Sequence, residues 1–279
     1  MKIQHLRNAT ALITIGDRVL LLDPMFGEVG SKMGLRVFRG ERRRNPLVPM
    51  PSGWEQAVEK ATDVLVTHQH FDHLDGRARH WTKQRGLPVW ASSIDVPYLR
   101  KSGLDAKVLR GGTFDSKVER IPARHGRGVI GWLMGHVSGF YLAHPDEPAI
   151  YIIGDSVPTK TVSEALDRLQ PEIVLVPAGA ANFGFGGDIL FSIDELVELT
   201  RNTTARVIFH HLESLDHCPT TRHSLRQRMK TENLLDRVLI PEDGETMVFS
   251  RQDHSPRPKS RTDSRPGPDF RKWITSKLG

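Results

Sequence analysis

The sequence predicts an α/β fold. Two fully apolar runs, 64–66 and 173–176, are typical of strands that are buried on both faces of a sheet. After residue 76, helical and strand patterns alternate as they do in βα units. The chain has 279 residues and no internal repeat or mid-chain linker, so one large domain or two small ones could form a substantial core.

The basic charge of the chain is concentrated at its C-terminal end. Residues 251–279 carry eight Arg or Lys and three Asp, which is +5 of the total formal charge of +6. The folded body, 1–250, is therefore nearly neutral. No nucleic-acid partner is expected, because a nucleic-acid-binding domain would carry its basic surplus in the body. The Pro/Ser/Arg composition of 251–279 predicts a disordered tail, with a short amphipathic helix at 270–278 as an alternative for its end.

Cysteine content and hydropathy bear on the compartment. The single cysteine, Cys218, excludes a disulfide framework and a cysteine-cluster metal site. Residues 1–7 lack the apolar core of a signal peptide, and no apolar run approaches the ~20 residues of a membrane span. We therefore expect a cytoplasmic protein without a transmembrane segment, which acts on a small molecule and could form a homo-oligomer.

The first strands lead to an acidic residue. Residues 2–6, 9–15 and 19–22 have strand patterns joined by tight turns, and they predict a meander at the edge of a sheet. The third strand ends at Asp23, which is followed by a proline. Asp23 either orients a metal ligand or simply forms the turn.

Residues 25–53 are predicted to form a long loop, because they show little periodicity and many Gly and Pro. So long a loop in a compact enzyme is usually functional or mobile. Its charged run, 39–44, contains four arginines. These arginines either meet an anionic group at a substrate rim or form an ordinary solvated surface.

Three histidines and an aspartate lie within six positions directly after the buried strand at 64–66. They are His68, His70, Asp72 and His73. Residues two apart in an extended loop point the same way, so the first two histidines can approach one ion while Asp72 and the third histidine approach a neighbouring point. Imidazoles and a carboxylate suit Zn²⁺ or another divalent transition metal. A coincidental cluster in a polar loop is the alternative.

This stretch resembles the signature of the metallo-β-lactamase superfamily, without a gap over residues 67–76. The resemblance covers about residues 1–250 and implies a four-layer αββα sandwich with the metals at one edge of the sheets. It also implies three further ligands. They are His125 after a strand at 117–123, Asp155 after a strand at 149–153, and a histidine after the strand that begins at Arg206.

The segments around these ligands alternate between helices and strands. Helices are predicted at 79–84, 95–102, 159–170 and 219–230, and further strands at 88–91, 137–143 and 173–176 and near residues 238 and 247. A capping box from Ser192 to Glu195 predicts a helix that runs to Arg201. The glycine-rich loop 177–188 lacks nucleotide-binding spacings and is expected to line the pocket.

The last ligand is one of two adjacent histidines, His210 and His211. Neighbours on a strand face opposite sides, so at most one of them can enter the same coordination sphere. Residues 207–218 resemble the ending of a bacterial branch related to ascorbate-phosphate lactonase, and this resemblance selects His211. In that register, Glu213 and His217 would orient ligands or face the substrate, and Cys218 would be a small packed residue.

The resemblance implies a binuclear hydrolase. One ion would be held by His68, His70 and His125, and the other by Asp72, His73 and His211, with Asp155 between them. Two divalent ions, for which Zn²⁺ is expected and Mn²⁺ or Fe²⁺ are alternatives, would lower the pKa of a bridging water toward ~7 and supply a hydroxide at neutral pH. Asp72 and His211 are the predicted catalytic residues, and Asp72 would exchange the proton.

The substrate expected from this chemistry is a small ester-like molecule, such as a lactone, amide, thioester or phosphoester, and an anionic substrate is one expectation. A phosphodiesterase or nuclease of the same superfamily shares the histidine-aspartate motif and is one alternative. A mononuclear iron dioxygenase acting on persulfides could use His68, His70 and His125 with Asp155. A metal-free binding scaffold would be expected to have lost ligands, and none is missing.

Overall fold

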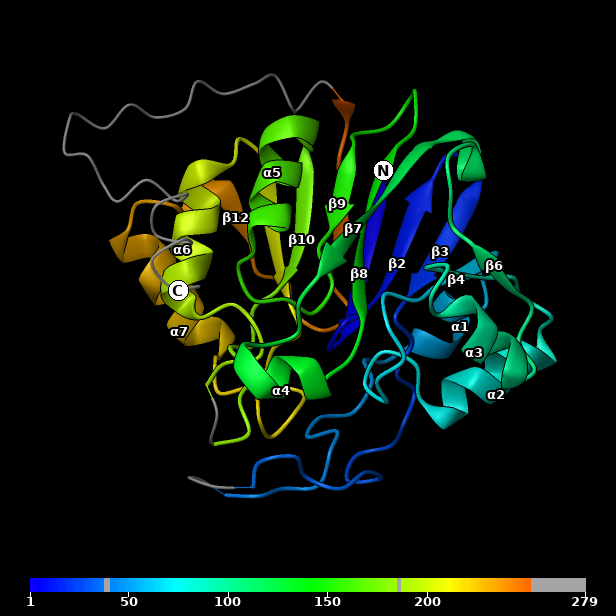
Figure 1. Cartoon of the computed structure of the whole chain (residues 1–279), viewed down its shortest axis with the longest axis horizontal. Helices are drawn as coiled ribbons and strands as arrows, with labels where there is room; N and C mark the ends of the chain where they lie inside the picture. The colour runs from blue at the N-terminus through cyan, green and yellow to red at the C-terminus, as the bar shows by residue number, and fades with distance from the viewer. Residues whose placement is uncertain (38–40, 185–186, 252–279) are drawn as a thin grey trace.

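The computed structural model describes residues 1–37, 41–184 and 187–251, and in this part of the chain two β-sheets lie face to face (Figure 1). The first sheet contains β1 (Lys2–Arg7), β2 (Thr10–Ile15), β3 (Arg18–Leu22), β4 (Asp63–Leu65), β5 (Val89–Ala91), β6 (Ala106–Val108) and β13 (Thr246–Val248). The second contains β7 (Lys117–Ala123), β8 (Val137–Ala143), β9 (Ile150–Ile152), β10 (Ile173–Pro177), β11 (Arg206–His210) and β12 (Val238–Leu239). The strand orders are β13-β1-β2-β3-β4-β5-β6 and β12-β11-β10-β9-β8-β7.

Helices cover the outer face of each sheet. On the first sheet they are α1 (Trp54–Val58), α2 (Gly76–Gln84) and α3 (Val96–Lys101), and on the second they are α5 (Lys160–Leu169), α6 (Ile193–Asn202) and α7 (Arg222–Thr231). The described residues also form α4 (Gly128–Leu133) and the short 3-10 turns η1 (Thr113–Asp115) and η2 (Leu235–Arg237). The predicted four-layer αββα sandwich is therefore confirmed. None of the helices in the described ranges is long and apolar enough to cross a membrane.

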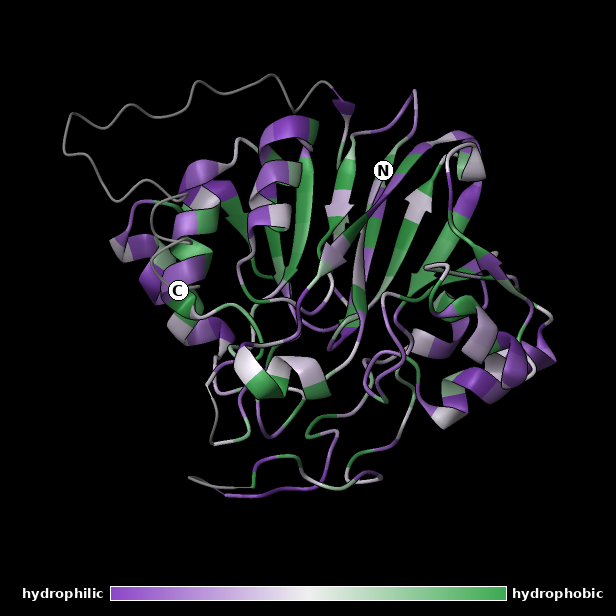
Figure 2. Ribbon diagram, viewed as in Figure 1, coloured by the Kyte–Doolittle hydropathy of each residue, from purple (hydrophilic) through white to green (hydrophobic). Residues whose placement is uncertain are grey.

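The apolar runs in the sequence become strands with two buried faces. In β4, Val64 packs in the cluster beneath the helices of the first sheet, while Leu65 packs in the cluster between the sheets. In β10, Val174 faces the helices of the second sheet and Leu175 faces the first sheet. Figure 2 shows that hydrophobic residues are concentrated on the strands, whereas polar residues lie on the outer helices. Alternate residues of a central strand thus pack in two different apolar layers, one between the two sheets and one between a sheet and its helices.

The N-terminal meander forms as predicted, but it does not lie at the edge of the sheet. β1 pairs with β13, and β3 pairs in parallel with β4, so both of its outer strands have neighbours. The strand Thr246–Val248 returns to β1 from the far end of the domain, and no local pattern in the sequence indicates this pairing. The edge prediction was therefore wrong because it depended on a contact between distant segments.

Short elements account for the other differences. The predicted helix 219–230 begins at Arg222, because Thr221 caps it through a hydrogen bond to the backbone N–H of Ser224. The sequence patterns did not identify α1, α4 or β6, which are three to six residues long. Residues 252–279, which include most of the tail predicted to be disordered, lie outside the described residues.

A buried arginine fixes the start and end of the long loop 25–53. The side chain of Arg7 is fully buried and donates hydrogen bonds to the carbonyls of Met25, Gly27 and Val48. Burial lowers the pKa of this guanidinium to about 10, so it stays charged at neutral pH. The two terminal nitrogens of this charged group, each bonded to at least one of these carbonyls, hold the two ends of the loop together.

Asp216 fixes the middle of the same loop. Its carboxylate accepts hydrogen bonds from the backbone N–H groups of Leu35 and Arg36 and from the side-chain amide of Asn45. Within the charged run, Arg42 and Arg44 donate to backbone carbonyls of the loop itself. Arg39 lies outside the described residues, and a substrate-facing role for this run stays a prediction.

We expect Ser192→Ala to lower the free energy of unfolding by about 1 kcal/mol, because it removes the N-cap of α6. The predicted capping box is present: Ser192 accepts from the backbone N–H of Glu195, and Glu195 accepts from that of Ser192. Ser192→Thr, which keeps a capping hydroxyl, is the control in chemical denaturation. Equal stabilities of the alanine and threonine variants would show that the cap contributes nothing.

Candidate metal centre

The seven predicted ligands meet where strands of both sheets end. The loop after β4 carries His68, His70, Asp72 and His73, and β7, β9 and β11 lead to His125, Asp155 and His211. β9 and β11 are both parallel to β10, and β7 and β9 are both antiparallel to β8. These three strands therefore end at the same edge of the second sheet, next to the end of β4.

The ligating atoms form two groups. The first consists of His68, His70 and His125, and the second of Asp72, His73, Asp155 and His211; within each group the candidate ligand atoms lie within 4.8 Å of one another. In the first group, His68 Nε2 lies 3.0 Å from His70 Nδ1. The division matches the one that the sequence predicted, although the role of these residues as ligands remains a prediction.

Asp155 lies between the two groups. Its Oδ2 atom is 3.2 Å from His125 Nε2 in the first group and 3.3 Å from His73 Nε2 in the second. The same oxygen is 3.7 Å from His211 Nε2. One carboxylate thus reaches histidines of both groups, as a residue that bridges two ions must.

Each of the five histidines has a partner on the nitrogen that points away from the centre. These partners are Thr67 Oγ1 for His68 (3.0 Å), Met134 O for His70 (2.9 Å), Asp23 Oδ2 for His73 (2.8 Å), Ile189 O for His125 (2.9 Å) and Cys218 Sγ for His211 (3.6 Å). A neutral imidazole that donates its outer N–H presents a lone pair on the other nitrogen. All five rings are therefore held so that the inner nitrogen can bind a cation.

Asp23 organises two of these histidines. Besides contacting His73, its carboxylate accepts hydrogen bonds from the backbone N–H and the hydroxyl of Thr67. Because that hydroxyl donates to Asp23, its oxygen is free to accept from His68. Of the two roles considered for Asp23, the structure supports the orienting one. The sequence offered no signal for the carbonyls of Met134 and Ile189, since any residue carries one.

The electrostatics of the second group favour a cation. Burial lowers the pKa of His73, but Asp155, Asp72 and Asp23 raise it to about 10. Burial likewise raises the pKa of Asp72, yet the charges of His73 and His211 bring it well below its usual range. Asp72 therefore stays ionised at neutral pH, and its buried negative charge stabilises positive charge next to it.

Two buried atoms in the second group lack a hydrogen-bond partner among the described residues, and this observation tests whether metal ions would fit. These atoms are His73 Nε2 and Asp155 Oδ1. Leaving such an atom unsatisfied costs roughly 1–3 kcal/mol, and coordination of a cation would remove that cost. The inward donors are imidazole nitrogens and carboxylate oxygens, which suit Zn²⁺, Mn²⁺ or Fe²⁺. The residues present thus fit divalent metal.

The structure separates the two adjacent histidines. His211 has a positive φ of 60°, and its Nε2 lies 3.2 Å from Asp72 Oδ2. His210 ends β11, is 3% exposed, and has no hydrogen-bond partner on either ring nitrogen among the described residues. Of the two, His211 alone belongs to the candidate ligand groups, and this is the histidine that the family resemblance selects; that it binds an ion stays a prediction.

The other polar residues near this ligand have contacts elsewhere in the fold, and a role for Glu213 or His217 in orienting ligands or facing the substrate stays a prediction. Glu213 accepts hydrogen bonds from Arg222, and the ring of His217 stacks on Phe183, so their described contacts are with other parts of the fold. Cys218 is buried in an apolar cluster with Met25, Leu190 and Leu215, as predicted, and it also contacts His211. Burial raises the pKa of this thiol.

Curated relatives carry the designation UPF0173, and several of them are named metal-dependent hydrolases. UPF0173 protein YddR of Bacillus subtilis is 28% identical over 254 residues, which cover 89% of this chain and the whole of that protein. A UPF0173 metal-dependent hydrolase of Cereibacter sphaeroides is 29% identical over 188 residues, or 64% of this chain and 74% of the relative.

Solved structures show the same fold. The crystal structure of isothiocyanate hydrolase from Delia radicum gut bacteria is 30% identical, with a TM-score of 0.82, over 90% of this chain and all of that one. A possible metal-dependent hydrolase from Veillonella parvula is 27% identical, with a TM-score of 0.81, over 89% and 99% of the two chains. The likeness to the lactonase-related branch stays a prediction. Residues 18–212 match the family described as beta-lactamase superfamily domain, and the chain belongs to this family.

Proposed function

We propose that this protein, a metal-dependent hydrolase, uses two adjacent divalent ions to hydrolyse a small molecule with an electrophilic carbon. The observation that carries the proposal is the convergence of two buried donor groups whose histidines are all oriented from outside. The same second group argues against a mononuclear iron centre, which would leave Asp72, His73 and His211 without a role.

The candidate ligands would be shared between the two ions. His68, His70 and His125 would hold one ion, Asp72, His73 and His211 the other, and Asp155 would contact both. When bound, the two ions supply a nucleophilic water at neutral pH and a Lewis acid for the substrate. In our proposal Asp72, whose Oδ2 lies 3.2 Å from His211 Nε2, exchanges a proton with the reacting groups.

Isothiocyanates are the substrate class that we propose to test first. The relative with 30% identity over nearly the whole chain is named for their hydrolysis. The central carbon of an –N=C=S group is electrophilic, and addition of water releases an amine and carbonyl sulfide without a redox step. Helix α4, whose following residue Met134 contacts His70, exposes Val129, Trp132 and Leu133. This apolar surface suits the hydrocarbon part of such a substrate.

We expect the zinc-loaded protein to convert benzyl isothiocyanate to benzylamine, at least ~100-fold faster than the protein stripped by a chelator, because the ions supply the nucleophile. Amine formation is the measurement, with a lactone, a thioester and a phosphodiester assayed in parallel. Turnover of one of these instead would reassign the substrate. Failure of the metal-loaded protein to hydrolyse any of them would contradict the proposed function.

Asp155→Asn should leave a folded protein with depleted metal and hydrolysis lowered by roughly 100-fold or more, since both ions would lose a charged ligand. The control is Asp146→Asn, an exposed change of the same chemistry. Metal content by mass spectrometry and turnover are measured on both. Two ions per chain and normal turnover in the Asp155 variant would rule out the two-metal mechanism.

His211→Ala should lose one ion and most activity, whereas His210→Leu should keep both. Because His210 is buried with two unsatisfied nitrogens, replacing it with an apolar side chain should leave the free energy of unfolding unchanged or raise it by up to about 1–3 kcal/mol. Metal content and thermal melting decide the outcome. Metal loss in the His210 variant alone would move the ligand assignment by one position.

A further inference from the structure

We propose that Cys218 is a positioning residue for the metal centre: its sulfur accepts a hydrogen bond from His211 Nδ1–H and thereby holds Nε2 toward Asp72 and Asp155. The inference rests on the proposed function, because it concerns the same site. It assigns a role to the chain's single cysteine, which lies next to a candidate ligand without belonging to either donor group.

The geometry places the sulfur behind the imidazole ring. Cys218 Sγ lies 3.6 Å from Nδ1 of His211, while Nε2 of the same ring faces Asp72 Oδ2 at 3.2 Å and Asp155 Oδ2 at 3.7 Å. The thiol is thus on the opposite side of the ring from the carboxylates. In this position it can set the orientation and tautomer of the ring, but it is not placed to bind an ion itself.

His211 needs such a partner because its backbone leaves the strand. Its φ of 60° lies in the left-handed region, directly after β11 ends at His210. Its backbone N–H donates to the carbonyl of Asn8, which fixes the main chain but leaves the ring free to rotate. The regular alternation of a strand therefore does not determine where this side chain points, and its own contacts must do so.

The glycine at position 179 leaves room for the contact between Cys218 and His211. A Cβ atom at Gly179 would lie 2.9 Å from both Cβ and Sγ of Cys218 and 2.6 Å from the carbonyl oxygen of His211. A side chain at position 179 would displace the sulfur of Cys218 or the backbone of His211. The backbone N–H of Thr220 also donates to the carbonyl of Gly179, which draws the segment after Cys218 against it.

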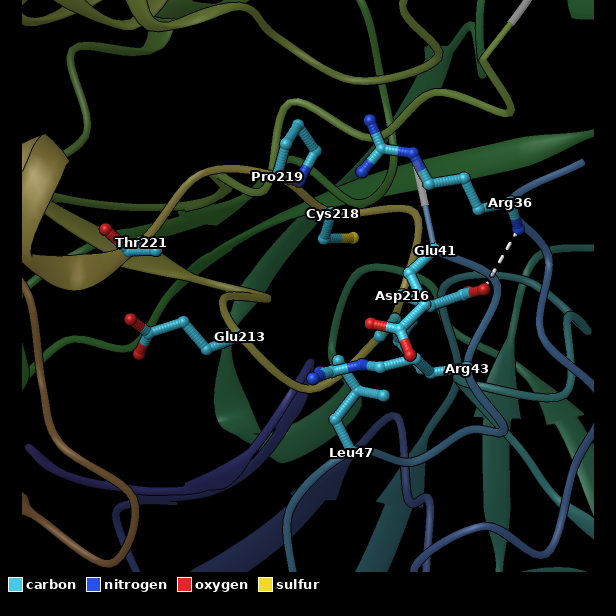
Figure 3. A pocket seen from close by; sticks show the side chains of 10 residues that line it. Arg36, Glu41, Arg43, Leu47, Glu213, Asp216, Cys218, Pro219 and Thr221 are labelled. Atoms are coloured by element: carbon cyan, nitrogen blue, oxygen red, sulfur yellow. Dashed lines mark hydrogen bonds between the residues drawn. The ribbon is translucent and has the colours of Figure 1, made fainter. Parts of the chain in front are cut away.

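Cys218 also lines a cavity, which makes smaller side chains tolerable at this position. Figure 3 shows Cys218 among the residues that line a cavity of about 320 Å³, between residues of the loop 36–47 and residues 213–221. Two of the acidic groups there, Glu213 and Asp216, already accept hydrogen bonds from Arg222 and from the backbone of the loop. A shortened side chain would enlarge this space and would not create a clash, so the variants below should fold.

The test compares Cys218→Ala with Cys218→Ser, which are nearly equal in size but differ in one hydrogen-bonding atom. Zinc affinity is measured by competition with a chromophoric chelator. Removing an outer partner of a metal ligand typically weakens binding by about 10–100-fold, so the alanine variant should lose this much at one of the two sites. The serine variant, which keeps an acceptor on a shorter bond, should lose clearly less.

A second readout follows the ring itself. In the cobalt-loaded protein, each bound imidazole with a protected outer N–H gives a shifted, exchangeable proton resonance. The resonance that disappears in His211→Ala identifies this residue, and it should exchange faster with solvent in Cys218→Ala than in the wild type. Melting of the metal-free variants reports folding separately, and if the alanine variant does not fold, the serine variant and the wild type carry the comparison.

Equal zinc affinity and equal proton exchange in the alanine variant and the wild type would overturn the proposal. Equal weakening in the alanine and serine variants would also overturn it, because packing and not the hydrogen bond would then matter. If the wild-type protein bound no metal at all, the proposed function would fail instead. The solvent exchange of the His211 Nδ1 proton in the metal-free wild type and Cys218→Ala, read by nitrogen NMR, would still decide whether Nδ1–H donates to the sulfur.

Discussion

The burial of seven ionisable side chains at the junction of the two sheets is the constraint on which the rest of the structure depends. Six of the seven are buried and His70 is partly exposed, so water can compensate for little of their lost solvation. On the side that faces away from the centre, each imidazole has a hydrogen-bonding partner, which is a hydroxyl, a carbonyl, a carboxylate or a thiol. Two atoms of the centre itself, His73 Nε2 and Asp155 Oδ1, are among the buried atoms without a hydrogen-bond partner in the described residues, and in our proposal a cation satisfies them.

The backbone makes this convergence possible by turning sharply where strands end. Asp23 after β3 and His211 after β11 have positive φ values, at 41° and 60°. Gly154 directly precedes Asp155 with a φ of 70°, and a Cβ there would lie 3.1 Å from the carbonyl oxygen of Ser138. Glycine adopts this conformation at little cost, whereas Asp and His accept it less readily. At these turns the side chains of Asp23, Asp155 and His211 leave the strand alternation and lie at the shared edge.

How far the sequence predicts this arrangement depends on the range of the interactions. The buried strands at 64–66 and 173–176 could be predicted because an uninterrupted apolar run fits a strand covered on both faces. The two donor groups could be predicted because four of the seven residues lie within six positions of the sequence and the family resemblance located the others. The orienting carbonyl of Met134 could not, because it follows a short helix with two glycines that has no clear periodicity. The anchoring of the loop by Arg7 was also unpredictable, since a fully buried arginine in a strand is rare.

Anomalous diffraction from crystals of the zinc-loaded protein, collected at the zinc edge, tests the central claim most directly. The account predicts two anomalous peaks per chain, roughly 3.5–4 Å apart. One should be contacted by His68, His70 and His125, the other by Asp72, His73 and His211, with Asp155 contacting both. A single peak, a peak coordinated by His210, or zinc bound away from these residues would contradict the account.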